Sequence, residues 1–300
     1  MQAERLVNPS TQTIGFIGLG VMGEPMCRNL RDKCSADVIA FDRDPLPLQR
    51  LAARGVRAAG TVREVGQSVG VVFLSLPAGE VVAEVSAELL PVAAAGQLIV
   101  DLGTSPVDLM RELARQFSAR GATFIDAPVA RTRAAAEAGT LAVMIGTDAA
   151  TFEAVRPLIA TFASEITHCG PVGCGQVVKI LNNMVLFETV MALSEAKAIA
   201  ERAGVDPERL FDALSKGSAD SFALRNHGMK AVLKDDFPLR AFSAAYARKD
   251  LSYALRLAQE TGVSAQGARS VDSWLAKAVE RGMQDRYWPV ISRLIGGQGA

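Results

Sequence analysis

The chain has few residues of the kinds that bind metals or form disulfide frameworks. It contains two histidines and four cysteines in 300 residues. No paired Cys-x-x-Cys motif occurs, so the ligand spacing of a structural zinc site is missing. We therefore expect no metal site and four reduced thiols. The residues concerned are His168, His227, Cys27, Cys34, Cys169 and Cys174.

An excess of charge of one sign is also missing. The 32 Lys and Arg residues balance 32 Asp and Glu residues, so no global positive field draws the chain to phosphate backbones or acidic membranes. The first twelve residues, MQAERLVNPSTQ, contain no apolar signal core. Glycine, proline or charge interrupts each apolar run before it reaches membrane-spanning length. We expect no nucleic-acid partner, no membrane partner and a cytoplasmic location.

The hydrophobic content of 49% is ample for one large or two ordinary domains. From Thr13 to about His168, short β-rich runs alternate with helical stretches, which is typical of a parallel sheet with helices on its faces. Several runs are almost continuously apolar, as strands covered on both faces require. The expected strands are Thr13–Gly18, Asp37–Asp42, Val71–Leu76, Leu98–Asp101, Thr123–Asp126, Ala142–Ile145 and Glu165–His168.

The strand pattern stops after Gly175. Residues 176–203 indicate one long helix that is apolar on most of its circumference and ends at Gly204. Such a helix should be buried between domains or subunits. Residues 206–208, Asp-Pro-Glu, then supply an N-cap, a first-turn proline and an acidic first turn for a further helix.

The predicted fold is a Rossmann-type α/β domain over residues 1–172 and an all-helical domain over residues 173–300. The long helix at about 176–203 joins the two domains. Its apolar surface indicates that another subunit covers part of it, so we expect a homodimer or homotetramer.

A glycine-rich turn follows the first expected strand. Residues 18–23, Gly-Leu-Gly-Val-Met-Gly, form a GxGxxG motif between a strand and a helix. The first glycine permits the tight turn, the second lets the backbone approach a pyrophosphate, and the third lets helix and strand pack closely. Asp42 lies nineteen residues beyond Gly23, at the end of the next strand, where a ribose-binding carboxylate is expected. Together they predict a dinucleotide site.

Asp42 favours NAD over NADP, because a carboxylate accepts hydrogen bonds from both ribose hydroxyls and repels a 2′-phosphate. Arg43 is the next residue. It could pair with such a phosphate if Asp42 turned away, or it could be a solvated surface charge. NADP therefore remains open as the cofactor.

A second informative segment contains Lys179 and Asn183, which are four residues apart and share one face of the long helix. Apolar surroundings and a nearby oxidised nicotinamide would both disfavour the ammonium form of this lysine. It could then donate a proton to a forming alkoxide or accept one from a hydroxyl. Equally, Lys179 could extend from a helix end into solvent and Asn183 could cap a neighbouring group. The residues alone leave both interpretations open.

Taken together, these motifs resemble the β-hydroxyacid dehydrogenase family, which includes the 3-hydroxyisobutyrate dehydrogenases, and the likeness covers nearly the whole chain. Residues 18–23 match its cofactor signature, and Gly173, Gly175, Lys179 and Asn183 match its GxGxxxKxxxN signature. The resemblance implies hydride transfer between a nicotinamide dinucleotide and a short hydroxy acid, with Lys179 as proton donor and acceptor.

The resemblance adds residues that composition and spacing do not reveal. Lys249 and Asp250 match a late Lys-Asp pair that closes over the cofactor in the family. Leu76-Pro77 matches the turn after the third strand, and Thr104 is what remains of a serine-threonine turn after the fourth. The cofactor-binding candidates are Gly18, Leu19, Gly20, Val21, Met22, Gly23, Asp42, Arg43, Leu76, Pro77, Thr104 and Lys249.

The expected substrate loop departs from the family pattern. Where members usually show Asp-Ala-Pro-Val-Ser-Gly-Gly, residues 126–132 read Asp-Ala-Pro-Val-Ala-Arg-Thr. In the usual loop, backbone N–H groups and the serine hydroxyl receive the substrate carboxylate. Arg131 can instead offer a planar fork of donors beside the Thr132 hydroxyl. The substrate-binding candidates are Ala130, Arg131, Thr132, Gly175 and Asn183.

This Arg-Thr variant resembles the sulfolactaldehyde reductase branch, which also handles short hydroxy acids such as 4-hydroxybutyrate. It favours a small anionic substrate with a sulfonate or a remote carboxylate. Alternatively, Arg131 points into solvent and Ala130 only fills space.

Two other functions share parts of this pattern. NADPH-dependent imine reductases have the same architecture but generally carry an acidic or aromatic residue at the lysine position. A non-catalytic NAD(P)-binding redox sensor would be free to lose Lys179, Asn183 and Lys249. All three are present, so the sequence favours a dehydrogenase acting on CH-OH groups.

Overall fold

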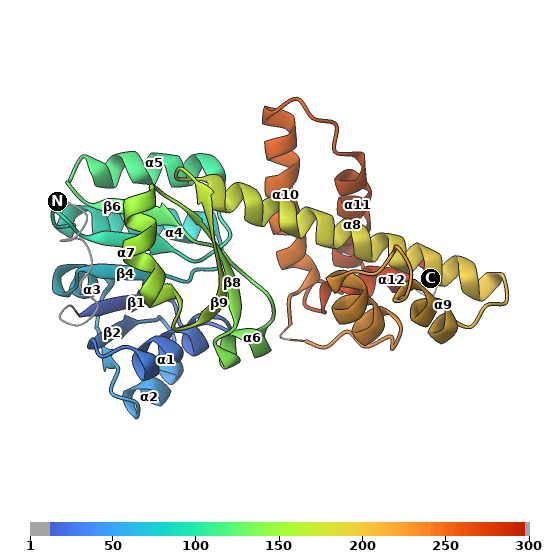
Figure 1. The fold of residues 1–300 in the computed structure, drawn as a ribbon, viewed down its shortest axis with the longest axis horizontal. Helices are drawn as coiled ribbons and strands as arrows, with labels where there is room; N and C mark the ends of the chain where they lie inside the picture. Colours follow the sequence, from blue (N-terminus) through green and yellow to red (C-terminus); the bar gives the residue numbers. More distant parts are fainter. Residues whose placement is uncertain (1–12, 240, 298–300) are drawn as a thin grey trace. The chain divides into compact units, whose positions relative to one another are not determined.

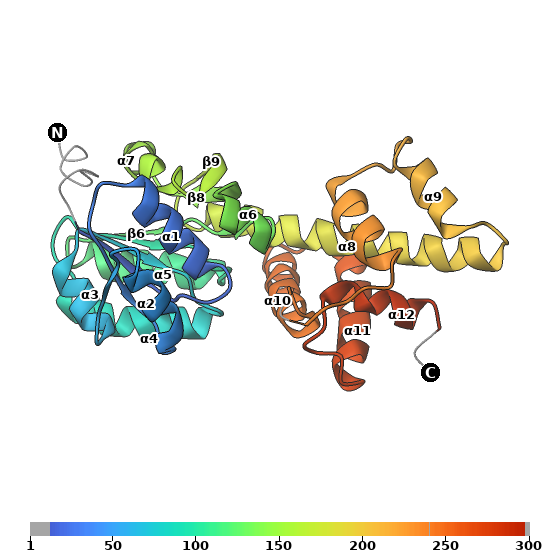
Figure 2. The same ribbon diagram turned by 90° about the horizontal axis from the view of Figure 1, so that it is seen from below.

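The structure, a computed structural model, describes residues 13–239 and 241–297 (Figures 1 and 2). The first twelve residues, in which the sequence shows no signal core, lie outside them. The chain divides into two compact units, Met1–Lys179 and Ile180–Ala300. The predicted domain boundary after residue 172 falls in the loop before the long helix, and it stays a prediction.

The first unit is built on one nine-stranded sheet with the order β3-β2-β1-β4-β5-β6-β8-β7, in which β9 also pairs with β8. Neighbouring strands from β3 to β6 are parallel, which is the Rossmann arrangement. The strands are β1 (Ile14–Ile17), β2 (Val38–Phe41), β3 (Arg57–Ala58), β4 (Val71–Leu74), β5 (Leu98–Asp101), β6 (Thr123–Asp126), β7 (Val129–Ala130), β8 (Leu141–Gly146) and β9 (Ala163–Gly170).

All seven predicted strands are present, and the sheet is parallel as predicted except around one strand. Strand β8 runs antiparallel to β6 and β7. Only residues 131–140 separate β7 from β8, and a parallel crossover needs about a dozen residues or more. The two-residue strands β3 and β7 were not predicted, because they are too short to show a periodic pattern.

Side chains of the sheet alternate between two apolar clusters, one on each face. Phe16 and Phe73 belong to one cluster, whereas Ile17 and Leu74 belong to the other. Burial on both faces explains the continuous apolar runs. The helices of this unit are α1 (Gly23–Lys33), α2 (Pro45–Ala52), α3 (Val62–Ser68), α4 (Gly79–Leu89), η2 (Leu90–Val92), α5 (Val107–Ser118), α6 (Arg133–Ala138) and α7 (Ala149–Ile159).

The elements of the second unit are all helices, apart from two isolated β-bridges between Leu239 and Arg286 and between Ser243 and Tyr287. Helix α8 (Cys174–Arg202) begins in the first unit and continues into the second, two residues earlier than predicted. The predicted cap of the next helix is confirmed, because the Asp206 side chain accepts from the N–H groups of Glu208 and Arg209. The other elements are α9 (Pro207–Leu214), the π-helix η3 (Leu224–Val232), α10 (Ala244–Glu260), α11 (Gln266–Glu280), η4 (Trp288–Val290) and α12 (Ile291–Ile295).

Among the described residues, α8 is the one helix long and apolar enough, by length and composition alone, to cross a membrane. Charged residues still interrupt its apolar runs, as the sequence predicted. Its buried side chains include Ile180, Phe187 and Val190, and it also carries Lys179 and Glu188. These features are those of a core helix.

Candidate active site

In the glycine-rich turn between β1 and α1, the first and third glycines are closely packed and the second is open. Gly18 has a φ of +93°, and a Cβ there would overlap the Ser75 carbonyl. A Cβ on Gly23 would overlap the carbonyl of Gly18, so α1 packs directly on the turn. A Cβ on Gly20, in contrast, would meet nothing within 4 Å.

No side chain caps the start of α1 at Met22. Helix N-terminal N–H groups without an intrahelical partner bind phosphate well. The open backbone at Gly20 and the uncapped helix therefore fit the pyrophosphate of a dinucleotide. Of the other predicted turn residues, Leu19 is buried in the core and Val21 is exposed.

Asp42 follows β2 and lies beside this turn. Its carboxylate accepts from the backbone N–H of Leu19 and, at 2.8 Å, from that of Asp44. The Arg43 side chain is 79% exposed and lies 3.7 Å from the Glu84 carboxylate. The structure thus places Asp42 at the turn and Arg43 on the surface.

The remaining cofactor candidates of the first unit follow neighbouring parallel strands. Leu76 and Pro77 come after β4, and the buried Thr104 comes after β5. Because β1, β4 and β5 are adjacent and parallel, the loops after them meet at the same edge of the sheet as Gly18. This is the edge at which open α/β sheets bind ligands.

The Arg131 side chain, in the predicted substrate loop, forms its hydrogen bonds with other residues of the first unit. Its Nη1 donates to the Thr140 carbonyl at 2.7 Å and to the Ser164 hydroxyl at 3.0 Å. Its Nη2 lies 3.9 Å from the Glu165 carboxylate. The guanidinium of this structure is therefore directed toward the residues before β8 and at the start of β9.

The backbone of Arg131 is unusual, with a φ of +87°. A non-glycine residue in this region is destabilised by about 1–2 kcal/mol. The family pattern has glycine here, so the chain keeps the loop's backbone shape with a different side chain. Beside it, Ala130 is buried, and the Thr132 hydroxyl caps α6 by accepting from the Ala135 N–H at 3.4 Å.

Lys179 and Asn183 lie one turn apart on α8, as predicted. Lys179 is 9% exposed and Asn183 is 2% exposed. The Asn183 amide is oriented by two neighbours: its Nδ2 donates to Asp250 at 2.8 Å, and its Oδ1 accepts from Asn182 at 3.2 Å. Both groups of the catalytic signature are thus buried polar side chains on a mainly apolar helix.

Asp250 on α10 binds Asn183 although it was not among the candidates. Asp250 also forms an ion pair with Lys249, whose Nζ lies 3.0 Å from Asp250 Oδ1. The same Nζ lies 4.0 Å from the ring centroid of Tyr246. In the sequence, Asp250 was indicated only by its place beside Lys249. That position does not reveal its contact with Asn183, 67 residues away.

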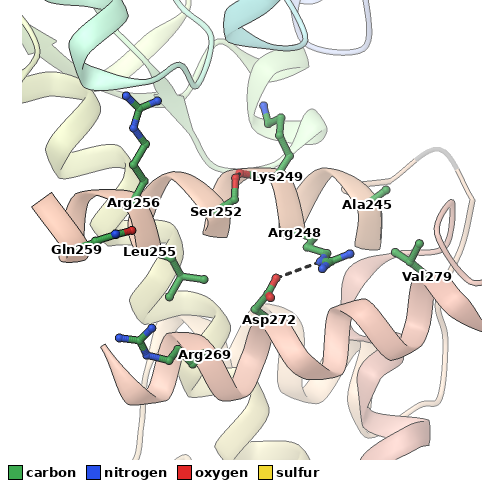
Figure 3. A pocket seen from close by; sticks show the side chains of 10 residues that line it. All are labelled: Ala245, Arg248, Lys249, Ser252, Leu255, Arg256, Gln259, Arg269, Asp272 and Val279. Atoms are coloured by element: carbon green, nitrogen blue, oxygen red, sulfur yellow. Dashed lines mark hydrogen bonds and ion pairs between the residues drawn. The ribbon is translucent and has the colours of Figure 1, made fainter. Parts of the chain in front are cut away.

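Lys249 also lines a pocket of about 880 Å³ along α10 and α11, where Arg248 pairs with Asp272 (Figure 3). The pocket is bordered by Ala245, Arg248, Lys249, Ser252, Leu255, Arg256, Gln259, Arg269, Asp272 and Val279.

The start of α8 is bound by a carboxylate that was not among the candidate residues. Asp126, at the end of β6, accepts from the N–H groups of Gly173 at 2.6 Å and Gln176 at 2.7 Å. Burial is the main reason that the pKa of Asp126 is raised to about 6. A Cβ on Gly175 would lie 2.8 Å from Asp126 Oδ2, so Gly175, a substrate candidate, packs against this carboxylate.

A Rossmann-type sheet with an open glycine turn and a carboxylate beside it, followed by a helix with a buried lysine and asparagine, defines a nicotinamide-dinucleotide-dependent dehydrogenase. The chain belongs to the β-hydroxyacid dehydrogenase family. Residues 13–170 match the family described as the NAD binding domain of 6-phosphogluconate dehydrogenase. Residues 173–290 match the family described as NAD-binding of NADP-dependent 3-hydroxyisobutyrate dehydrogenase. The chain is an NAD(P)-dependent oxidoreductase acting on CH-OH groups of hydroxy acids.

Individual relatives agree with this assignment. The chain is 33% identical to a 2-(hydroxymethyl)glutarate dehydrogenase of Eubacterium barkeri, over 83% of each protein. It is 34% identical to a probable 3-hydroxyisobutyrate dehydrogenase of Mycobacterium bovis, over 89% of this chain and 93% of that protein. A solved 3-hydroxyisobutyrate dehydrogenase of Mycobacterium tuberculosis with L-serine superposes with a TM-score of 0.87 at 32% identity, covering 95% of this chain and 99% of the other.

Proposed function

We propose that the protein interconverts a short-chain β-hydroxy acid and its semialdehyde, with NAD(H) as cofactor and Lys179 as general acid/base. The observation that carries this proposal is the pair of buried polar side chains, Lys179 and Asn183, one turn apart on α8. When bound, the nicotinamide supplies or accepts the hydride.

Lys179 moves the proton that accompanies the hydride. In reduction its ammonium donates to the developing alkoxide, and in oxidation its neutral amine accepts the hydroxyl proton. Asn183 orients the substrate oxygen near it. Because Asp250 accepts from one N–H of the Asn183 amide, the direction of that amide is set before the substrate arrives.

Asp42 supports NAD over NADP. Its carboxylate is held beside the glycine turn by two backbone N–H groups, where it would repel a 2′-phosphate. Arg43, the residue that could offset this repulsion, is directed to the surface and lies near Glu84.

The substrate class we propose is a hydroxy acid with a sulfonate or a remote carboxylate. The support is the Ala130-Arg131-Thr132 segment, which retains the left-handed backbone at position 131 and adds a guanidinium at the edge of the loop. The Eubacterium barkeri relative is named for a glutarate, which carries a second carboxylate. A homodimer or homotetramer in the cytoplasm is part of the same proposal.

The test is an absorbance assay of NADH and NADPH oxidation with short aldehydes that carry a carboxylate, a sulfonate or no charge. We expect NADH and a sulfonated or remote-carboxylate aldehyde to be preferred. Activity with compact carboxylates alone would contradict the substrate class. Lys179→Ala should lower kcat by about 10²- to 10⁴-fold and leave NADH affinity nearly unchanged, because no pyrophosphate contact is removed.

Lys197→Ala is the matched control, since Lys197 lies on the same helix and pairs with Glu201. It should keep the kcat of the wild type. A substantial rate retained by Lys179→Ala would rule out the acid/base role.

A further inference from the structure

The helix that carries Lys179 cannot cap its own start. The residue before Cys174, the first residue of α8, is Gly173, which has no side chain. Asp126 of β6 supplies the missing acceptor, at 2.6 Å from the Gly173 nitrogen and 2.7 Å from the Gln176 nitrogen. The first N–H groups of a helix have no intrahelical acceptor, so this carboxylate satisfies donors that would otherwise be buried without a partner.

Two glycines make room for this carboxylate. A Cβ on Gly175 would lie 2.8 Å from Asp126 Oδ2, and a Cβ on Gly146 of β8 would lie 2.8 Å from the same oxygen. Gly173 has a φ of +93°, which side chains rarely adopt, and a Cβ there would approach Arg111 instead. Gly146 and Gly175 therefore leave the space that Asp126 fills.

Gln176 ties the same turn of α8 to the loop after β5. Its Oε1 accepts from the Ser105 N–H at 3.1 Å, and its Nε2 donates to the Gly103 carbonyl at 2.8 Å. Gln176 is fully buried and lies three residues before Lys179, on the same side of the helix.

We propose that Asp126 is a positioning residue for Lys179: it sets the rotation and the axial position of the first turn of α8. This proposal rests on the acid/base role of Lys179. One residue of slippage in a helix rotates a side chain by about 100°, and a misplacement of about 1 Å can lower a rate about 100-fold. The hydrogen bonds from Gly173 and Gln176 prevent both movements.

The charge state of Asp126 gives this role a measurable signature. Desolvation first, and then the charge of Asp101, raise the pKa of Asp126 to about 6, against the hydrogen bonds from Gly173 and Gln176. Once protonated, one carboxyl oxygen becomes a donor and a weaker acceptor for an N–H.

Other ionisable groups lie around Asp126. They include Asp101 on β5, Cys169 on β9, Cys174 at the start of α8, and Arg111 on α5 beside Gly173. In the reducing direction Lys179 must be protonated, which acidic pH favours. A loss of kcat as the pH falls through about 6 is assigned to Asp126, and the disappearance of this loss in Asp126→Asn separates Asp126 from Asp101.

The experiment compares Asp126→Asn with Asp148→Asn in the reducing direction. Asp148 caps α7 by accepting from Ala150 and Thr151 at 3.0 Å each, so it is an equivalent cap on an unrelated helix. Asp126→Asn should lower kcat by about 10- to 100-fold, leave the KM for NADH within about twofold and abolish the decline of kcat below about pH 6. Asp148→Asn should retain the kcat and the decline.

A wild-type kcat in Asp126→Asn, or an unchanged acidic decline, would overturn the proposal. If Asp126→Asn does not fold, folded wild-type enzyme is measured from neutral pH to about pH 5, and a flat kcat overturns it as well. If the wild type reduces no semialdehyde at all, the proposed function fails. Amide hydrogen exchange of residues 173–180 then decides: faster exchange in Asp126→Asn but not in Asp148→Asn supports the positioning role, and equal exchange overturns it.

Discussion

At the scale of single residues, Asp42 joins the glycine turn to the segment after β2. One carboxylate oxygen accepts from Leu19 and the other accepts from Asp44. The carboxylate is thereby fixed next to the ribose position that the Rossmann arrangement predicts. In the proposed function, its negative charge is the feature that favours NAD over NADP.

Replacing this charge should change the cofactor preference. We expect Asp42→Ser to raise the ratio of kcat/KM for NADPH to that for NADH by about 10- to 100-fold, because repulsion of the 2′-phosphate is removed. Steady-state kinetics with both cofactors measure the ratio.

Asp44→Ser is the control for this change, because Asp44 is a neighbouring acid that caps α2 through Leu46. It should leave the ratio unchanged. An unchanged ratio in Asp42→Ser would show that another group discriminates the cofactors.

At the scale of elements, α1 and α6 are joined by side-chain hydrogen bonds from Arg28 and Asn29 of α1. The buried Asn29 of α1 donates to the Ala136 carbonyl of α6 at 2.9 Å and to the Pro25 carbonyl of its own helix at 3.0 Å. Gly139, at the end of α6, has a φ of +70°, and a Cβ there would lie 2.9 Å from Asn29 Oδ1. Asn29 thus links the helix after the cofactor turn to the helix after the substrate loop.

Removing this link should loosen α6. We expect Asn29→Ala to lower the free energy of unfolding by about 1–3 kcal/mol, because buried carbonyls lose their donor. Amide exchange in α6 should become faster. Denaturant unfolding and hydrogen exchange test this, with Asn226→Ala as the control, because the half-buried Asn226 makes its hydrogen bonds locally, to the Phe222 carbonyl and to Lys230. Wild-type stability in Asn29→Ala would contradict the prediction.

At the scale of the whole molecule, each unit buries a group whose pKa, between about 4 and 6, differs from its value in the unfolded chain. Burial raises the pKa of Asp126 in the first unit to about 6. Burial, and then the charge of Lys230, lower the pKa of His227 in the second unit to about 4. His227 lies on the π-helix and is hydrogen-bonded to Tyr287.

The two groups should act on stability in opposite directions. Between pH 6 and 4, folded Asp126 binds a proton that the unfolded chain does not, so the first unit gains stability as the pH falls. Over about the same range, unfolded His227 binds a proton that the folded chain does not, so the second unit loses stability. Each effect amounts to about 3 kcal/mol at most.

Hydrogen exchange resolved by unit measures this difference. As the pH falls from about 6 to about 4, opening should become more frequent in the second unit and less frequent in the first. The pH dependence of the second unit should largely disappear in His227→Phe, which has no titratable ring. The same acid response in wild type and His227→Phe would exclude His227 as its source.

Much of the fold and part of the site could be predicted from the sequence, because the signals are local. Strand periodicity, the glycine spacing of residues 18–23 and the separation of Lys179 from Asn183 each lie within a few residues of chain. Local backbone sterics and helix geometry act over that range. The family assignment, which the comparisons confirm, rests on the same segments.

By itself, the sequence determined the class of the fold, the position of the dinucleotide turn and the helix face that carries Lys179. Only the tertiary structure decided that β8 runs antiparallel, that the Arg131 guanidinium bonds Thr140 and Ser164, and that Asp126 caps α8. It also joined Asn183 to Asp250. The physical reason is that these contacts connect residues up to 67 positions apart, and their partners are chosen by packing, which no local periodicity encodes.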